Sequence, residues 1–262
     1  MSSTYTGALL LASVAFMAIA TKKLSKARSY KDDRLGFIFD LDGTLLDFEG
    51  ASHIALSIPL AKYGKSVDWP LHASICGKPA HYWSKEVLQA LNVTEMTPEE
   101  YSAAFHANIK LAFPTMPLMP GALEFVKRLR NMFPDAGFAI ATSSERHSFD
   151  IKMSYHTDLL KNFDVVVTGN EIPNGKPNPD IFLEAARRLG VRPHRCAVFE
   201  DAPSGAQAGR RAGATVVAIP DDRMVGNETA FSFVDFKVRS LLEIDTDMLE
   251  AIVDRMKRKS LM

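Results

Sequence analysis

Five short apolar runs, four of which end at a polar residue, constrain the fold of this chain more than any other feature. They are the segments 36–39, 137–141, 165–167, 196–199 and 215–219. Runs this short and this apolar are typical of strands buried on both faces, as in a parallel sheet. Stretches with helical spacing of apolar residues lie between them, notably 121–133 and 180–189. The alternation predicts an α/β fold with a doubly wound, mostly parallel, Rossmann-like sheet.

A helical segment interrupts this alternation after the first predicted strand. Between 48 and 116 no strand-like run occurs, and the stretches 51–63, 82–91 and 99–113 have the pattern of helices. The interval is too long for a loop between a strand and its helix. We therefore expect a core formed by 32–47 and 117–262, with a helical cap domain, 48–116, inserted into it.

The first 31 residues differ from the rest in composition. Residues 7–20 are continuously apolar or small, and five basic residues follow them with no acidic one. The apolar stretch is shorter than the roughly 20 residues that a membrane span needs. By the positive-inside rule it suits a marginal membrane anchor, or an organelle-targeting segment, on a cytoplasmic body. The alternative is an N-terminal helix without a targeting role.

The charge balance argues against one class of function. The 262 residues include 31 Lys and Arg against 31 Asp and Glu, a formal net charge of zero. A nucleic-acid-binding surface normally brings a basic excess, so no nucleic-acid partner is expected. The two cysteines, Cys76 and Cys196, match no metal-binding spacing, and both are expected to be buried. The oligomeric state is left open, with a monomer favoured.

The first predicted strand leads directly into Asp40-Leu41-Asp42-Gly43-Thr44. A carboxylate can attack phosphorus and form an aspartyl-phosphate, which divides a difficult hydrolysis into two steps, and Asp40 is placed for this role. Asp42 is placed to protonate the leaving oxygen and later to activate water. Gly43 and Thr44 are expected to bind the phosphate in a tight turn. Alone, the string is also compatible with an ordinary Asp-Gly turn.

Further polar residues follow the second predicted strand, and another lies in the loop after the third predicted strand. Thr142, Ser143 and Ser144 could bind phosphate through a hydroxyl and amides at a helix N-terminus, or could simply cap that helix. Lys176, in the proline-rich loop 175–180, would supply a fixed positive charge near the nucleophile, unless it is an ordinary surface lysine.

An acidic pair, Glu200 and Asp201, follows the fourth predicted strand. With Asp40 and the backbone carbonyl of Asp42, the pair offers a set of oxygen ligands suited to Mg²⁺. The alternative is that the two residues cap the next helix. Because the carboxyl ends of parallel strands meet at one edge of a sheet, all of these motifs would gather there.

In this order the four motifs resemble those of the haloacid dehalogenase (HAD) superfamily of phosphohydrolases. The matching segments are FDLDGTLLD (39–47), ATSS (141–144), GKPNPDIF (175–182) and FEDAPSGAQAGRRAGA (199–214). The resemblance implies that Asp40 is the nucleophile, that Asp42 is the acid/base, and that Thr142 and Lys176 bind phosphate. It also implies that the helical insertion is an α-helical C1 cap.

Within that family the chain looks closest to pseudouridine-5'-phosphatase-like members, and glycerol-3-phosphatases and FMN hydrolases are similar too. The expected substrate is a small phosphorylated metabolite. The cap is expected to set specificity because it closes over the leaving group. Gly77 and Lys78, in a break between two predicted cap helices, are the candidate substrate-contacting residues.

The leading hypothesis is a Mg²⁺-dependent phosphatase that hydrolyses a phosphate monoester through phospho-Asp40. A phosphomutase of the β-phosphoglucomutase type is the alternative among enzymes. A catalytically silent HAD-like binding or scaffold protein is the alternative outside them. The intact set of Asp40, Asp42, Lys176 and Asp201 counts against a scaffold, which needs none of these residues.

Overall fold

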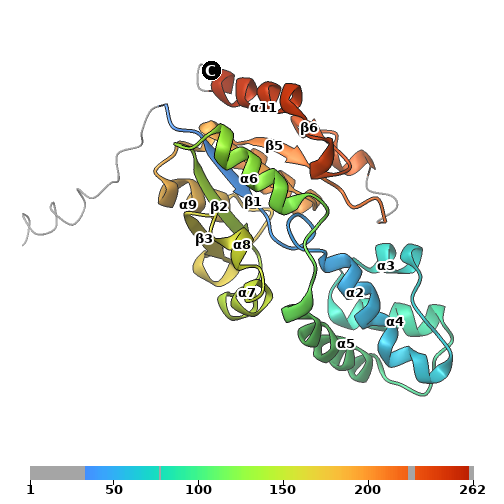
Figure 1. Cartoon of the computed structure of the whole chain (residues 1–262). Helices are drawn as coiled ribbons and strands as arrows, with labels where there is room; N and C mark the ends of the chain where they lie inside the picture. Colours follow the sequence, from blue (N-terminus) through green and yellow to red (C-terminus); the bar gives the residue numbers. More distant parts are fainter. Residues whose placement is uncertain (1–32, 77, 224–227, 260–262) are drawn as a thin grey trace, which may run out of the picture.

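A parallel sheet forms the centre of this computed structural model, which describes residues 33–76, 78–223 and 228–259 (Figure 1). The strands are β1 (Gly36–Phe39), β2 (Gly137–Thr142), β3 (Val165–Thr168), β4 (Cys196–Glu200), β5 (Thr215–Ala218) and β6 (Phe236–Lys237). They lie in the order β3-β2-β1-β4-β5-β6, and every pair is parallel. The predicted doubly wound α/β fold is confirmed. The short strand β6 was not predicted because its two residues form no apolar run.

Alternate residues of the central strand belong to two separate hydrophobic cores, one on each face of the sheet. Phe37 and Phe39 pack toward α6 (Ala122–Met132) and α11 (Thr246–Lys259), whereas Ile38 packs on the opposite side. That opposite side is covered by helices α9 (Asp180–Leu189) and α10 (Pro203–Arg211). The remaining core helices are α7 (Arg146–Met153) and α8 (Thr157–Leu160), with short helices η3 (Gly169–Glu171), η4 (Pro193–Arg195), η5 (Glu228–Phe231) and η6 (Leu241–Glu243).

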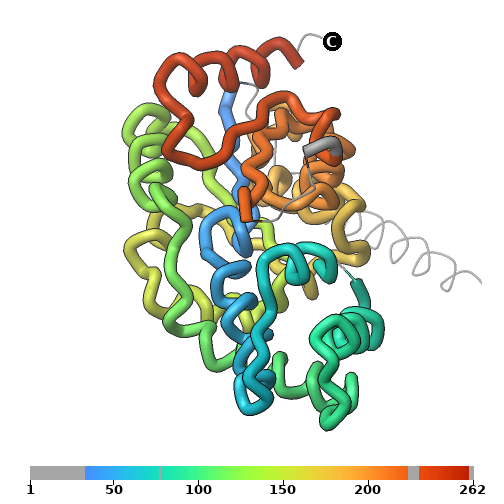
Figure 2. Tube along the Cα trace, turned by 90° about the vertical axis from the view of Figure 1, so that its right-hand side faces the viewer, coloured from blue at the N-terminus to red at the C-terminus, as the bar shows by residue number. Residues whose placement is uncertain are grey.

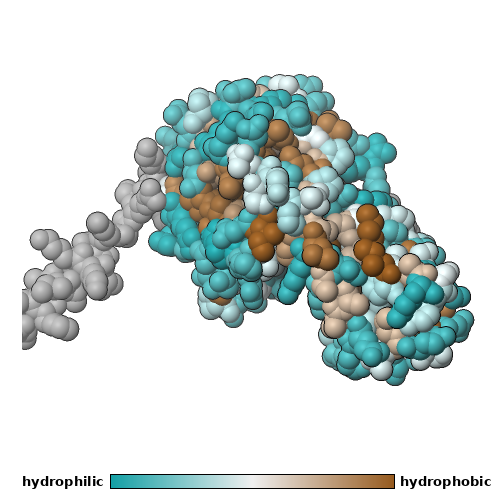
Figure 3. Space-filling model, turned by 60° about the horizontal axis from the view of Figure 1, so that its bottom comes forward, coloured by the Kyte–Doolittle hydropathy of each residue, from teal (hydrophilic) through white to brown (hydrophobic). Residues whose placement is uncertain are grey.

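The helices between β1 and α6 lie together beside the sheet (Figures 1 and 2). They are α2 (Phe48–Ser57), η1 (Ile58–Tyr63), α3 (Trp69–Ile75), α4 (Ala80–Ala90), α5 (Pro98–Ala112) and η2 (Phe113–Thr115). They enclose a hydrophobic core of their own, which includes Leu56, Trp83 and Tyr101. Figure 3 shows this part as a lobe beside the larger one. The division of the chain at 48 and 116 stays a prediction.

Helix α3 and the cysteine that follows it differ from what we expected. Asp68 caps this helix by accepting from the Leu71 N–H at 2.9 Å, yet its seven residues are too few for a clear apolar repeat. Cys76, directly after the helix, is exposed, so the expectation of burial was wrong for this residue. Cys196 is buried as expected because it lies in the central part of the sheet.

An arginine joins the start of the cap to the core. The Arg223 guanidinium lies 2.5 Å from both Asp47 Oδ1 and Asp221 Oδ2. Asp47 in turn caps helix α2 by accepting from the Gly50 N–H at 2.9 Å. This connection fixes the first turn of α2 against the edge of the sheet at which the strands end.

No helix among the described residues is long and apolar enough to cross a membrane. The N-terminal segment 1–31, with the proposed anchor at 7–20, lies outside the described residues.

Candidate active site

Asp40 follows β1 at the point where the order of the strands reverses, between β1 and β4. In open α/β sheets this switch point is where ligands bind. The Asp40 side chain is buried and accepts a hydrogen bond from the Lys176 ammonium. Burial raises the pKa of Asp40 to about 7, although Lys176 acts in the opposite direction. The proximity of the two residues agrees with the prediction of a lysine beside the nucleophile.

Lys176 also contacts the acidic pair at the end of β4. Its Nζ lies 2.7 Å from Glu200 Oε1, and its side chain is buried. Burial disfavours the charge of an ammonium, but the carboxylates of Asp40 and Glu200 outweigh this effect and raise the pKa of Lys176. Lys176 is therefore a fixed cation between two carboxylates, and the alternative of an ordinary surface lysine does not hold.

Both carboxylate oxygens of Glu200 accept hydrogen bonds within the protein. Oε1 accepts from Lys176, and Oε2 accepts from the Ala202 N–H at 2.7 Å. Gly205 in α10 makes room for this carboxylate, because a Cβ at that position would lie 1.6 Å from Glu200 Oε1. The direct effect of Glu200 in this arrangement is to orient Lys176.

The Asp-Gly turn after β1 brings Asp201 to the same place. Gly43 has a φ of +90°, and a Cβ there would lie 2.1 Å from Asp201 Oδ2, so only glycine fits the turn. Its N–H donates to the Leu46 carbonyl at 2.8 Å, so the turn itself uses that amide. The Thr44 hydroxyl donates to Asp201 Oδ1 at 3.2 Å. Gly43 and Thr44 thus hold Asp201 in position beside Asp40.

Asp42 has a partner that sequence reasoning missed. Lys152 in α7 lies with Nζ 2.8 and 2.7 Å from the two Asp42 carboxylate oxygens and 3.0 Å from Ser144 Oγ. Ser144 Oγ donates to Asp42 Oδ2 at 2.8 Å. The Lys152 side chain is 2% exposed. One signal in the sequence could have identified it. Lys152 lies on the same face of this short helix as Phe149 and Met153, which are buried, although lysine is normally exposed.

Lys152 also contacts both ends of the cap segment. Its Nζ lies 4.8 Å from the ring centroid of Phe48, the first residue of α2, and 4.7 Å from that of Phe113, the first of η2. Attraction between an ammonium and an aromatic face favours both contacts. The side chain therefore connects the predicted acid/base to the two segments through which the cap joins the core.

The Thr-Ser-Ser segment, which begins with the last residue of β2, contacts Asp42 through Ser144 and does not cap α7. Thr142 is buried, and its Oγ1 accepts from the Ser144 N–H at 3.1 Å. Helix α7 begins at Arg146, with Glu145 in the capping position. Ser143 is exposed, and its carbonyl oxygen packs so closely on Gly169 that a Cβ there would lie 2.3 Å away.

One of the two predicted substrate-contacting residues, Lys78, forms an ion pair within the cap. The Lys78 Nζ lies 2.6 Å from Glu86 Oε2, an exposed pair within the cap itself. Gly77 lies outside the described residues.

The gathered charges suit a divalent cation. Three carboxylates, those of Asp40, Glu200 and Asp201, lie around the single ammonium of Lys176. Burial, and then the charges of Glu200 and Asp40, raises the pKa of Asp201 well above its usual value. The cluster thus lacks positive charge and offers oxygen atoms, which are the ligands that Mg²⁺ prefers.

Comparison with known proteins decides the family. A family model described as a haloacid dehalogenase-like hydrolase matches residues 35–213. The chain belongs to the haloacid dehalogenase-like hydrolases. The predicted family and enzyme class are thereby confirmed, and the matched residues include the first three motifs and all but the last residue of the fourth.

Curated members of the family are similar over most of this hydrolase. A mitochondrial (DL)-glycerol-3-phosphatase of Arabidopsis thaliana is 35% identical over 212 residues, covering 76% of this chain and 70% of the relative. A probable pseudouridine-5'-phosphatase of Drosophila melanogaster is also 35% identical, over 76% of this chain and 90% of the relative. A HAD family hydrolase from Deinococcus radiodurans, solved with bound phosphate and sodium, has the same fold, with a TM-score of 0.70 and 24% identity over 85% of this chain and 98% of that one.

Proposed function

We propose that this hydrolase removes the phosphoryl group from a small phosphorylated metabolite, a phosphate monoester, through an aspartyl-phosphate on Asp40. The observation that carries the proposal is the pairing of Asp40 with Lys176 at the switch point of the sheet, with Asp42 and Asp201 close to Asp40. The names of the curated relatives, phosphatases of glycerol phosphate and pseudouridine phosphate, support the substrate class.

The chemistry takes two steps on residues that the fold holds together. In the first step an Asp40 carboxylate oxygen bonds to phosphorus, the bond from phosphorus to the ester oxygen breaks, and Asp42 gives that oxygen a proton. In the second, Asp42 accepts a proton from water as the water oxygen attacks phosphorus, and Asp40 is released. Lys176 offsets negative charge on the phosphoryl group, and the hydroxyls of Thr142 and Ser144 lie near it.

Asp40, Asp201 and the backbone carbonyl of Asp42 would hold Mg²⁺ in this proposal. Glu200 lies beside them with both oxygens already in use, so its contribution is to the charge of the site and to Lys176. When bound, the ion supplies positive charge to the phosphoryl oxygens and orients them.

Replacing Asp201 tests the metal assignment. We expect Asp201→Ala to require at least about tenfold more Mg²⁺ for half-maximal activity, because the loss of one ligand weakens a site by such factors. Activity is measured as a function of Mg²⁺ concentration. In a separate control, excess EDTA is expected to stop the wild-type enzyme. Full wild-type activity in EDTA would refute a role for the metal. The matched control is Asp254→Ala, since Asp254 is an exposed carboxylate on helix α11.

Replacing Lys152 tests whether it positions the acid/base. We expect Lys152→Met to lower kcat by roughly 10²-fold with a much smaller change in KM, because misplaced general acid–base catalysis costs about that much. Lys152→Arg, which keeps the charge, should recover part of kcat. A wild-type kcat in Lys152→Met would show that the ammonium has no positioning role.

A screen for phosphate release over sugar phosphates, glycerol phosphate, FMN, nucleotides and pseudouridine phosphate tests the function and identifies the substrate. Inorganic phosphate without an isomerised sugar phosphate is the expected product, whereas isomerisation would show a phosphomutase. The absence of release from every compound would favour a binding or scaffold protein.

Once the preferred substrate is known, Lys78→Ala is expected to raise the KM for it by about tenfold and to leave the KM for a small generic ester unchanged.

A further inference from the structure

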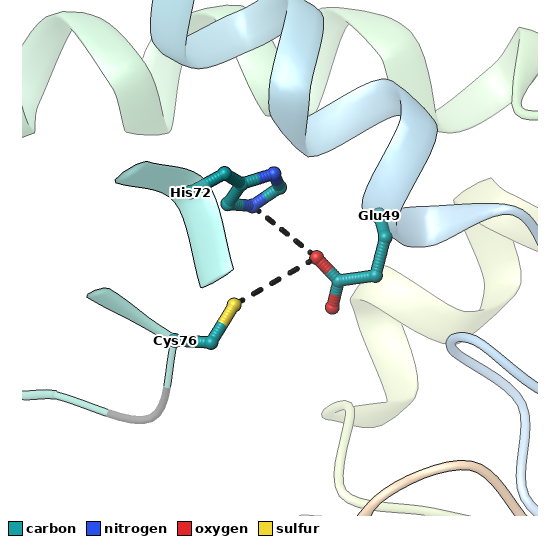
Figure 4. A group of neighbouring side chains, drawn as sticks. All are labelled: Glu49, His72 and Cys76. Atoms are coloured by element: carbon teal, nitrogen blue, oxygen red, sulfur yellow. Dashed lines mark hydrogen bonds and ion pairs between the residues drawn. The ribbon is translucent and has the colours of Figure 1, made fainter. Parts of the chain in front are cut away.

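A second group of potential metal ligands lies in the cap, apart from the residues assigned above. Glu49 belongs to the first turn of α2, His72 to α3, and Cys76 directly follows α3 (Figure 4). His72 Nε2 lies 3.3 Å from Glu49 Oε2, and Cys76 Sγ lies 3.9 Å from the same oxygen. One ligand atom from each residue falls within 4.8 Å of the other two.

These separations are close to those required around a tetrahedral zinc ion. Zinc binds nitrogen and oxygen at about 2.0–2.2 Å and sulfur at about 2.3 Å, which puts neighbouring ligand atoms about 3.3–3.7 Å apart. The nitrogen–oxygen distance of 3.3 Å already has this value, and the sulfur–oxygen distance of 3.9 Å is slightly longer. Rotation of the Cys76 side chain would bring its Sγ closer to the other two ligand atoms, both of which lie within 4.8 Å.

The neighbouring residues favour a fixed ligand set with one open side. His72 is 2% exposed, and its ring lies in a stack with His53 and Trp69, with centroids 5.6 and 5.5 Å away. Its position is therefore held before any ion binds. Cys76 is exposed, which gives an ion a path from solvent and leaves room for a water molecule in the fourth position.

Carboxylates surround the Cys76 thiol. Those of Glu49, Asp201 and Asp221 lie close enough to act on it electrostatically. Two of those carboxylates come from the core, so the cluster faces the edge of the sheet that carries the candidate active site. A cation placed among these charges would convert the thiol to a bound thiolate and release its proton.

We propose that Glu49, His72 and Cys76 form a second metal site, for Zn²⁺ or another divalent cation that favours sulfur, distinct from the Mg²⁺ site of the reaction. The three ligand types are those that zinc takes in sites with an open position, whereas Mg²⁺ prefers oxygen alone. The bound ion would join the C-terminal end of α3 to α2. It would thereby restrain the segment that leads to Lys78, the predicted substrate-contacting residue.

Cobalt(II) is the probe for this site because its absorption reports a bound thiolate. The full chain is titrated with Co²⁺ in saturating Mg²⁺, which occupies the oxygen ligands of the first site. We expect a thiolate-to-cobalt charge-transfer band that saturates at one ion per chain and disappears when Zn²⁺ is added. No such band in the wild-type protein would overturn the proposal.

Two pairs of variants assign the ligands. Cys76→Ser is expected to abolish the band and to weaken Zn²⁺ binding at least tenfold, whereas Cys196→Ala, which removes the other cysteine, keeps both. Glu49→Gln should weaken Zn²⁺ binding while the band remains, and Asp201→Ala should keep both the band and Zn²⁺ binding at one ion per chain. Unchanged Zn²⁺ binding in Cys76→Ser, or its loss in Asp201→Ala, would show that the ion occupies the first site only. Because binding is measured without substrate, failure of the proposed phosphatase activity would leave this test intact.

Discussion

The variant Asp40→Asn is expected to lose turnover by about 10⁴-fold or more, since it removes the attacking oxygen and no other group in the site can replace it. Asparagine has nearly the same shape, so the fold should be kept. The measurement is phosphate release under saturating Mg²⁺ with the preferred substrate. Activity within tenfold of wild type would contradict the assignment of Asp40 as nucleophile.

The same variant is expected to be more stable than the wild type in metal-free buffer at pH 8. Burial raises the pKa of Asp40 from 3.8 to about 7 in the folded protein. A raised pKa means that the folded state binds the proton more tightly, so stability is lost as the pH rises from about 4 to about 7. Asparagine carries no charge and avoids this loss. Thermal unfolding is measured for both proteins at pH 5 and pH 8. The melting temperature of Asp40→Asn should exceed that of the wild type by more at pH 8 than at pH 5, and the same difference at both pH values would contradict the prediction.

Lys176→Met is expected to give the largest loss of stability. It removes the ammonium that lies between Asp40 and Glu200 and leaves two buried carboxylates without their cation. Removing one partner of a buried ion pair typically costs about 3–5 kcal/mol. The loss should be larger at pH 8 than at pH 5, because the pKa of Asp40 is raised to about 7 and its protonation at low pH removes one of the two charges. Denaturant unfolding at the two pH values measures it.

Lys161→Met is the matched control, since Lys161 forms an exposed pair with Asp158 at 2.7 Å. Exposed pairs contribute little to stability, so this variant should unfold as the wild type does. If Lys176→Met behaved like the control, the ion pairs of Lys176 would have no energetic role in the site.

The core and its motifs could be predicted because their signals are local. Each strand from β1 to β5 is a short apolar run, and each motif follows its strand or loop directly in the sequence. Once the strands are parallel, their carboxyl ends must meet, which places Asp40 near Asp201 without further information. Gly43 shows the limit of such reasoning. The sequence predicts that its N–H binds phosphate, but this N–H donates to the Leu46 carbonyl, and the glycine leaves room for the Asp201 carboxylate.

The rest depends on contacts between segments far apart in the sequence. Lys152 lies 110 positions from Asp42 and belongs to no motif, so only the packing of α7 reveals the pair. The pairing of Lys78 with Glu86 instead of with the site depends in the same way on how the cap helices pack. His72 and Cys76 approach Glu49 only because the short helix α3, which carries no clear apolar repeat, packs against α2.

Trapping the covalent intermediate tests the central claim most directly. The wild-type enzyme is mixed with its preferred substrate and Mg²⁺, quenched in acid within one turnover, reduced with borohydride and digested for peptide mass spectrometry. Borohydride converts an aspartyl-phosphate to homoserine, so the account predicts homoserine at position 40 and an unchanged Asp42. A labelled residue other than Asp40, or substrate turnover with no labelled peptide at any quench time, would contradict it.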